Sequence, residues 1–215
     1  MHLNQTQQAK VPLMNLANML TLLRIILAPV FVVIFFLPKE FSIILVPVLW
    51  AIFIISEITD YFDGLAARKL NLTSDFGKLF DPFADTLLQL TYFLCFLIDG
   101  IWHYRFFSLA LVLIVIYREF GILFLRNLML KKGVTLGARI LGKTKTVSYI
   151  TAVSAALVAV SIERIKILGS FLPLEYFRIG ALVIFAISVV FSVISFIDYL
   201  LLYFRTGTPS GNVNE

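Results

Sequence analysis

Residues 60–85 read DYFDGLAARKLNLTSDFGKLFDPFAD, and this stretch sets two pairs of aspartates into an otherwise apolar chain. Asp60 and Asp63 are three residues apart, and Asp81 and Asp85 are four apart, so each pair can share one face of a helix. Acidic side chains are costly near a membrane, and a set of them marks a site more often than a scaffold. The spacing therefore predicts two helix ends whose carboxylates converge on a metal centre.

The composition is that of an integral membrane protein. Of the 215 residues, 60% are hydrophobic and 14% are charged, against roughly 25% charged residues in an average soluble domain. The formal charge of +5 suits loops that orient the chain and contact anionic lipid, and no basic stretch interleaved with aromatics indicates a nucleic-acid partner. Cys95 is the only cysteine and lies in an apolar run, which excludes disulfides and thiolate metal sites.

Apolar runs long enough to cross a bilayer follow one another with short connections. We therefore predict an all-α integral membrane protein with six transmembrane helices in a single domain, residues 15–205. A polar segment, 1–14, precedes this domain, and a polar tail, 206–215, follows it. The predicted spans are Asn15–Leu37, Ile43–Tyr61, Phe76–Ile98, Phe106–Leu130, Thr146–Ile162 and Tyr176–Phe204.

The distribution of basic residues predicts the orientation of these spans. Six spans place the amino terminus, the connections after the second and fourth spans, and the tail on one side. With the adjoining helix ends, that side carries 13 Lys and Arg residues and the other side carries 5. We expect the first side to face the cytoplasm, and the aspartates of residues 60–85 fall on that side.

Four carboxylates on adjoining helices favour a hard divalent cation, because magnesium, manganese and calcium prefer oxygen ligands. The two histidines give no support to a zinc or copper site, since His2 lies in the polar segment and His103 is predicted on the opposite side. A metal-bound diphosphate fits such a cluster, because the cations neutralise charge on the departing group. One aspartate is then available to remove a proton from an attacking hydroxyl.

Small residues lie beside the aspartates. They are Gly64, Ala67 and Gly77, each four residues from one of the four carboxylates. On the aspartate face of each helix they leave room for a flat ligand such as a nucleobase. The alternative is that they serve close packing between helices.

The stretch reproduces the pattern D-x2-D-G-x2-A-R-x8-G-x3-D-x3-D without a departure. Eight specified positions at fixed spacing, in a membrane protein with this number of spans, resemble the signature of the CDP-alcohol phosphotransferase family. The resemblance implies six transmembrane helices, usually a homodimer, and a cytoplasmic-facing site for a CDP-linked substrate and a divalent cation, Mg²⁺ or Mn²⁺. It also implies that an acceptor alcohol attacks the β-phosphoryl group and that CMP leaves.

The same resemblance gives each specified position a role. The expected metal ligands are Asp60, Asp63, Asp81 and Asp85, and Asp85 is also the expected general base. The residues expected along the cytidine and diphosphate are Asp60, Asp63, Gly64, Ala67, Arg68 and Gly77.

Further stretches resemble bacterial phosphatidylglycerophosphate synthases within this family. They are Asn15–Ile25, Ser56–Gly64, Arg118–Phe120 followed by Arg126, and Gly142–Thr146, which looks like the loop before the fifth helix. The combined resemblance covers about residues 15–150, and the last third of the chain adds nothing to it. It implies a bacterial inner-membrane enzyme that converts CDP-diacylglycerol and sn-glycerol 3-phosphate into phosphatidylglycerophosphate and CMP.

An acceptor that carries a phosphate needs cations separate from the metal cluster. Arginine can hold a phosphate through two hydrogen bonds, and lysine supplies a point charge. Glu119 is most simply a partner that orients a neighbouring arginine, and the alternative use of the basic residues is anchoring at the membrane surface. The candidates for the acceptor phosphate are Arg118, Arg126, Lys143 and Lys145, with Arg139 as a further one.

Two departures from the synthase pattern leave the acceptor open. The run Leu136–Arg139 lacks the usual serine, and Thr86 stands where a lysine often follows the last aspartate. The alternatives with the same chemistry use inositol phosphate, inositol or serine as the acceptor, or transfer phosphocholine from CDP-choline to diacylglycerol. A remote alternative is a cation transporter, which predicts acidic residues near the bilayer midplane and repeated halves, and no repeat is visible in the sequence.

Overall fold

The computed structural model describes residues 16–69, 75–131 and 140–207. In these ranges the chain forms helices and no strand. The elements are α1 (Leu16–Phe36), η1 (Lys39–Phe41), α2 (Ser42–Lys69), α3 (Asp75–Asp99), α4 (Arg105–Lys131), α5 (Ile140–Arg164), α6 (Lys166–Phe171) and α7 (Leu174–Gly207).

The six long helices of the described ranges coincide with the six predicted spans, which confirms an all-α integral membrane protein. Among the described residues, every long helix except α3 is long and apolar enough to cross a bilayer. α3 carries Asp81 and Asp85, and it packs against α1, α4 and α5. The helix that carries two of the predicted aspartates therefore packs against three others.

Two helix boundaries differ from the predicted spans. α2 continues past Tyr61 to Lys69, so the whole segment from Asp60 to Arg68 is helical. α5 begins at Ile140, so Gly142–Thr146 forms its first turns, and the prediction of a loop there was wrong. The reason is that polar residues end an apolar run in the sequence without interrupting the backbone hydrogen bonds of a helix.

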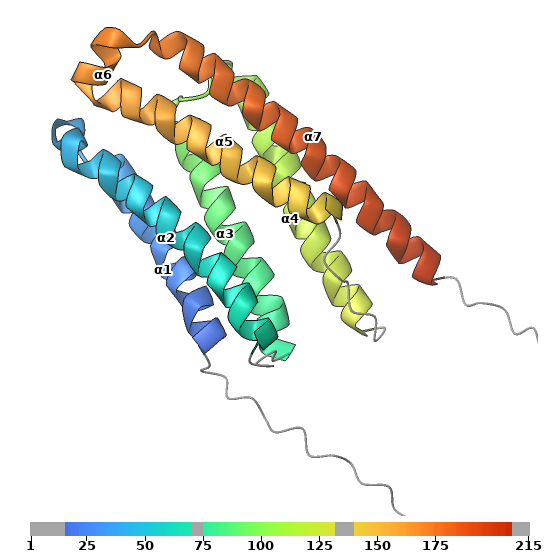
Figure 1. Cartoon of the computed structure of the whole chain (residues 1–215). Helices are drawn as coiled ribbons and strands as arrows, with labels where there is room; N and C mark the ends of the chain where they lie inside the picture. The colour runs from blue at the N-terminus through green and yellow to red at the C-terminus, as the bar shows by residue number, and fades with distance from the viewer. Residues whose placement is uncertain (1–15, 70–74, 132–139, 208–215) are drawn as a thin grey trace, which may run out of the picture.

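Consecutive long helices run in opposite directions (Figure 1). Figure 1 shows α1 beside α2 and α5 beside α7, and both pairs are in extensive contact. The short helix α6 links α5 to α7. This arrangement brings the starts of α1, α3 and α5 to the same end of the bundle as the last turns of α2, α4 and α7, and the candidate site lies at that end.

At the opposite end, the connection from α3 to α4 closes the bundle with an aromatic side chain. Gly100 ends α3 in the left-handed region, with φ of +76°, a conformation that glycine adopts at little cost. The amide of Ile101 then donates to the carbonyl of Phe96 at 3.1 Å. The turn directs Trp102 inward, where it stacks on Phe185 of α7 with ring centroids 4.1 Å apart.

A network of ion pairs also joins the helix ends at this opposite end. Arg164 of α5, with its side chain 1% exposed, donates to the carbonyl of Phe35 at 2.8 Å and to Asp99 at 3.3 Å. Glu163 accepts hydrogen bonds from Lys39 and Arg178, each at 2.9 Å. Paired charges thus join η1 and the ends of α3, α5 and α7, and a hydrogen bond from Arg164 to a backbone carbonyl adds the end of α1.

Candidate active site

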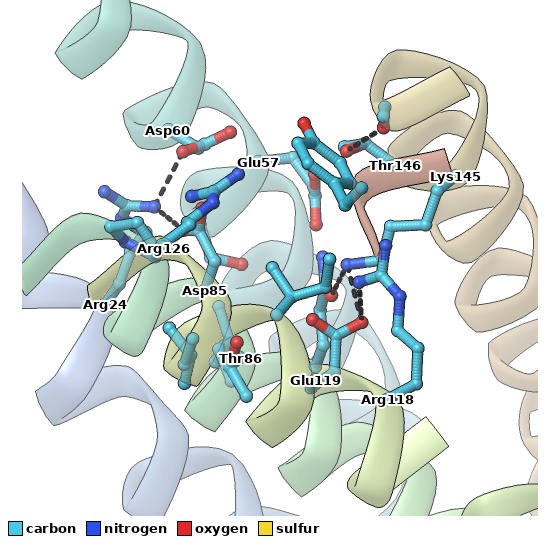
Figure 2. A pocket seen from close by; sticks show the side chains of 18 residues that line it. Arg24, Glu57, Asp60, Asp85, Thr86, Arg118, Glu119, Arg126, Lys145 and Thr146 are labelled. Carbon is cyan, nitrogen blue, oxygen red and sulfur yellow. Dashed lines mark hydrogen bonds and ion pairs between the residues drawn. The ribbon is translucent and has the colours of Figure 1, made fainter. Parts of the chain in front are cut away.

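A cavity opens at the end of the bundle where the predicted site residues meet. Side chains of α1, α2, α3, α4, α5 and α7 line it. Figure 2 shows that acidic side chains of α2 and α3 lie toward one end of it, and that Arg118, Glu119 and Lys145 lie together toward the other. The cavity therefore has two chemically distinct regions.

The carboxylates of Asp60 and Asp85 converge on one arginine. Arg24 of α1 donates from Nη1 to Oδ1 of Asp60 at 2.7 Å, and the same Nη1 donates to Oδ1 of Asp85. Two carboxylates from two different helices thus reach a single nitrogen atom. Because opposite charges attract strongly where water is scarce, this contact holds α1, α2 and α3 together at the cavity.

Asp81 belongs to the same network through a hydroxyl group. Thr21 of α1 donates to Oδ1 of Asp81 at 2.5 Å, and Arg24 donates from Nη2 to the Thr21 hydroxyl at 3.4 Å. Three of the four predicted aspartates are therefore connected through two side chains of α1. We refer to Thr21, Arg24, Asp60, Asp81 and Asp85 as the acidic network.

The remaining predicted ligands of the CDP and metal site are only partly described. Gly77 is buried in α3. The residues Asp63, Gly64, Ala67 and Arg68 lie in α2, but their side chains are outside the described part of the structure. Among the described residues, no group of three or more His, Cys, Asp or Glu side chains is arranged around a common metal position. The metal-ligand assignment therefore stays a prediction.

The second region of the cavity is a buried cluster of opposite charges. Glu119 of α4 accepts from Arg118 Nη1 at 2.7 Å and from Lys145 Nζ at 2.8 Å, both on Oε1. The side chains of these three residues are 5–11% exposed. One carboxylate faces two cations, so the cluster carries a net positive charge within the bundle. We call Arg118, Glu119 and Lys145 the basic cluster.

Helices α3, α5 and α7 hold the two cations in place. Arg118 donates from Nε to the carbonyl of Ser192 at 3.1 Å and from Nη2 to the hydroxyl of Ser195 at 3.3 Å. Lys145 donates to Gln89 at 3.1 Å and lies 4.4 Å from the centre of the Tyr149 ring. The orientation of each cation is therefore set by several partners and not by Glu119 alone.

The other predicted acceptor residues have different surroundings. Arg126 also lines the cavity, about two turns from Arg118 and on nearly the same face of α4, as the spacing of eight residues predicts. Lys143 is exposed near the start of α5 and is not one of the residues that line the cavity. Arg139 lies outside the described residues.

The sequence prediction missed the contributions of α1 and α7. Thr21 and Arg24 lie in the stretch Asn15–Ile25, which served only to show the resemblance to the synthases. A polar pair three residues apart on an apolar helix could have indicated them. Ser192 and Ser195 repeat this spacing on α7, and Tyr199 one turn further on lines the cavity. The last third of the chain therefore takes part in the site.

Removing Glu119 should destabilise the protein, because it leaves Arg118 and Lys145 buried without their shared carboxylate. We expect Glu119→Leu to lower the stability by about 3 kcal/mol, the size of effect seen when one partner of a buried ion pair is lost. Thermal unfolding in detergent measures the loss. As a control, Glu175→Leu removes an exposed partner of His103 and should change the unfolding temperature little.

The double variant Glu119→Leu/Lys145→Leu tests the electrostatic origin of that loss. Removing a cation together with the carboxylate relieves the repulsion between Arg118 and Lys145, so the double variant should be more stable than Glu119→Leu alone. Losses that simply add would contradict this explanation.

Comparison with known proteins finds a matching family model and several similar proteins. The sequence model of the CDP-alcohol phosphatidyltransferase family matches residues 14–194. The CDP-diacylglycerol–glycerol-3-phosphate 3-phosphatidyltransferase of Treponema pallidum is 37% identical over 153 residues, which are 71% of this chain and 68% of that protein. The protein of the same name from Bacillus subtilis is 41% identical over 155 residues, 66% of this chain and 76% of the relative. A probable phosphatidylglycerophosphate synthase of Mycobacterium tuberculosis is 33% identical over 188 residues, 86% of this chain and 80% of the relative.

Proposed function

Because the chain belongs to the CDP-alcohol phosphatidyltransferase family, we propose that it transfers the phosphatidyl group of CDP-diacylglycerol to sn-glycerol 3-phosphate. The products are phosphatidylglycerophosphate and CMP. The observation that carries this proposal is the presence of the acidic network and the basic cluster in one cavity. Membership of the family makes the chain an enzyme and removes the cation transporter from the alternatives.

The acidic network suits a divalent cation. Its oxygen atoms are hard ligands of the kind that Mg²⁺ and Mn²⁺ prefer, and Asp60 and Asp85 already reach one nitrogen atom, so both lie within reach of one cation. The residues that would hold the metal are Asp60, Asp63, Asp81 and Asp85. When bound, the cation neutralises the diphosphate of the substrate and the charge that develops on CMP.

Asp85 is proposed as the general base. Its side chain is 38% exposed and lines the cavity, so an acceptor hydroxyl can approach it. As the acceptor oxygen forms its bond to the β-phosphorus, Asp85 takes the hydroxyl proton, and the bond from that phosphorus to the oxygen of CMP breaks. Gly64, Ala67, Arg68 and Gly77 are proposed to lie along the cytidine and diphosphate.

The basic cluster is proposed to bind the phosphate of the acceptor. Arg118 and Lys145 carry two positive charges against the single carboxylate of Glu119, so an incoming phosphate supplies the charge that the cluster lacks. Arg126, which also lines the cavity, is a third cation for this role, and Lys143 and Arg139 remain candidates. An acceptor without a phosphate would leave the net charge of the cluster uncompensated.

The charge distribution and the family resemblance support a proposal for the location and assembly of the protein. The chain is a multi-pass membrane protein, and we propose that it lies in the cytoplasmic membrane as a homodimer. The cavity lies at the end of the bundle that the 13 to 5 distribution of Lys and Arg assigns to the cytoplasm. A water-soluble acceptor would enter there.

The acceptor can be identified by measuring CMP release from CDP-diacylglycerol in membranes that contain the protein. We expect sn-glycerol 3-phosphate to stimulate release, and inositol phosphate, inositol and serine to have little effect. EDTA should abolish release and added Mg²⁺ or Mn²⁺ should restore it. Stimulation by inositol phosphate alone would replace the proposed acceptor, and activity that persists in EDTA would contradict the metal.

Replacing the proposed base should stop the chemical step. We expect Asp85→Asn to lower kcat by about 10²- to 10⁴-fold, the contribution of a general base, while CDP-diacylglycerol still binds. Asp99→Asn is the matched control, because Asp99 is on the same helix at the opposite end of the bundle. Near-normal turnover in folded Asp85→Asn would exclude this role.

Truncating Arg118 should affect the acceptor more than the lipid substrate. We expect Arg118→Ala to raise the KM for sn-glycerol 3-phosphate by about 10- to 100-fold, since a charge-assisted phosphate contact is worth about 1.5–3 kcal/mol. The KM for CDP-diacylglycerol should change much less. Arg118→Lys retains the charge without the planar fork and should recover part of the loss. Equal increases in both KM values would make Arg118 a structural residue.

A further inference from the structure

Arg24 is placed unusually for a cation in an apolar helix. Its side chain is 1% exposed, and its Nη1 donates to Oδ1 of both Asp60 and Asp85. These two aspartates are among the proposed metal ligands, and Asp85 is also the proposed base. The arginine thus occupies the space between two carboxylates that the reaction requires for other purposes.

The partners of Arg24 differ from those of Arg164, another buried arginine that joins two helices. Arg164, at the opposite end of the bundle, pairs with Asp99, whose side chain is 12% exposed. The side chains of Asp60 and Asp85 are 43% and 38% exposed and line the cavity. The arginine is therefore enclosed in both cases, but only the carboxylates of Asp60 and Asp85 can be reached by a ligand.

A divalent cation and the guanidinium group compete for these carboxylates. Mg²⁺ binds carboxylate oxygen at about 2.0–2.1 Å, and Oδ1 of Asp60 already accepts from Arg24 at 2.7 Å. A bound cation and a guanidinium nitrogen that share the same two oxygens also repel each other at short range. A cation that binds through Oδ1 of Asp60 and Oδ1 of Asp85 would therefore displace Nη1 of Arg24 from between them.

We propose that Arg24 is a built-in counter-ion of the metal-free site, which the divalent cation displaces from Asp60 and Asp85. The inference rests on the proposed function, because it takes the acidic network as the metal site. In the absence of metal, Arg24 of α1 offsets the repulsion between Asp60 of α2 and Asp85 of α3 and so keeps the three helices together. With metal bound, the same guanidinium is released beside the diphosphate, whose oxygens suit its planar fork.

Removing Arg24 should change metal binding in the opposite direction to removing a scaffold residue. A residue that only positions the aspartates would weaken metal binding when it is removed. A competing cation would strengthen it, because its removal takes away both the competition and the repulsion. At the same time the metal-free protein would become less stable, since Asp60 and Asp85 would lose their partner.

The test is a Mn²⁺ titration of purified full-length protein in detergent, in which electron paramagnetic resonance measures the unbound Mn²⁺. Thermal unfolding is measured on the same samples in EDTA and in saturating Mn²⁺. We expect Arg24→Gln to bind Mn²⁺ at least about tenfold more tightly than the wild type, a change of about 1.4 kcal/mol. Its unfolding temperature should fall in EDTA and recover in Mn²⁺.

Arg164→Gln is the matched control, because it removes a buried arginine that joins helices away from the acidic network. It should lower the unfolding temperature equally in EDTA and in Mn²⁺ and leave the Mn²⁺ affinity unchanged. Arg24→Lys keeps the charge with a weaker hold on two carboxylates, so its Mn²⁺ affinity should lie between those of the wild type and Arg24→Gln. If Arg24→Gln does not fold, the Mn²⁺ affinity of Arg24→Lys tests the proposal in its place.

Equal or weaker Mn²⁺ binding in the folded Arg24 variants would overturn the proposal and make Arg24 a scaffold residue. Failure of the proposed function would look different. In that case the wild type would bind no stoichiometric Mn²⁺, or Asp81→Asn would bind it as well as the wild type does. The two results are distinguishable because the first concerns Arg24 alone and the second concerns the acidic network itself.

Discussion

The structure depends on one constraint: a charge that enters an apolar helix bundle needs an opposite charge beside it. The described residues meet this constraint in three places. Arg24 lies between Asp60 and Asp85, and Glu119 lies between Arg118 and Lys145. At the opposite end of the bundle the pairs involve Arg164, Arg178 and Lys39. Each group joins helices that are distant in sequence, so charge compensation and helix packing are achieved by the same contacts.

The two charged groups in the cavity have net charges of opposite sign, and this difference relates the fold to the proposed chemistry. Among their described members, the acidic network has more carboxylates than cations and the basic cluster has more cations than carboxylates. The first suits a divalent cation with a diphosphate, and the second suits a phosphate. A single cavity can therefore hold a lipid-linked nucleotide and a phosphorylated alcohol without placing their negative charges against each other.

The sequence predicted the parts of this arrangement that depend on local pattern. Apolar runs located the six long helices, and the fixed spacing of the aspartates located the acidic end of the cavity. The resemblance and the need for a phosphate-binding group indicated Arg118, Arg126 and Lys145, which the structure brings to the cavity, while their roles stay predictions. The helices could be predicted because hydropathy and helical periodicity are properties of short segments.

The parts that the sequence did not predict depend on contacts between distant segments. Thr21 and Arg24 act on residues about 36–61 positions away, and Ser192 and Ser195 hold an arginine more than 70 positions earlier in the chain. The polar start of α5 was predicted as a loop because it lacks apolar residues. A single sequence does not show which isolated polar residues meet across a bundle.

The aromatic layer beneath the cavity has a consequence for the membrane itself. Phe93, Phe96, Trp102 and Phe185 are at most 2% exposed and are in direct ring contact, with centroids 4.1–6.0 Å apart. Packing of this kind leaves no file of water along which ions could cross. Among the described residues, these rings fill the bundle interior next to its closed end, so we expect water to enter the cavity from one end of the bundle only.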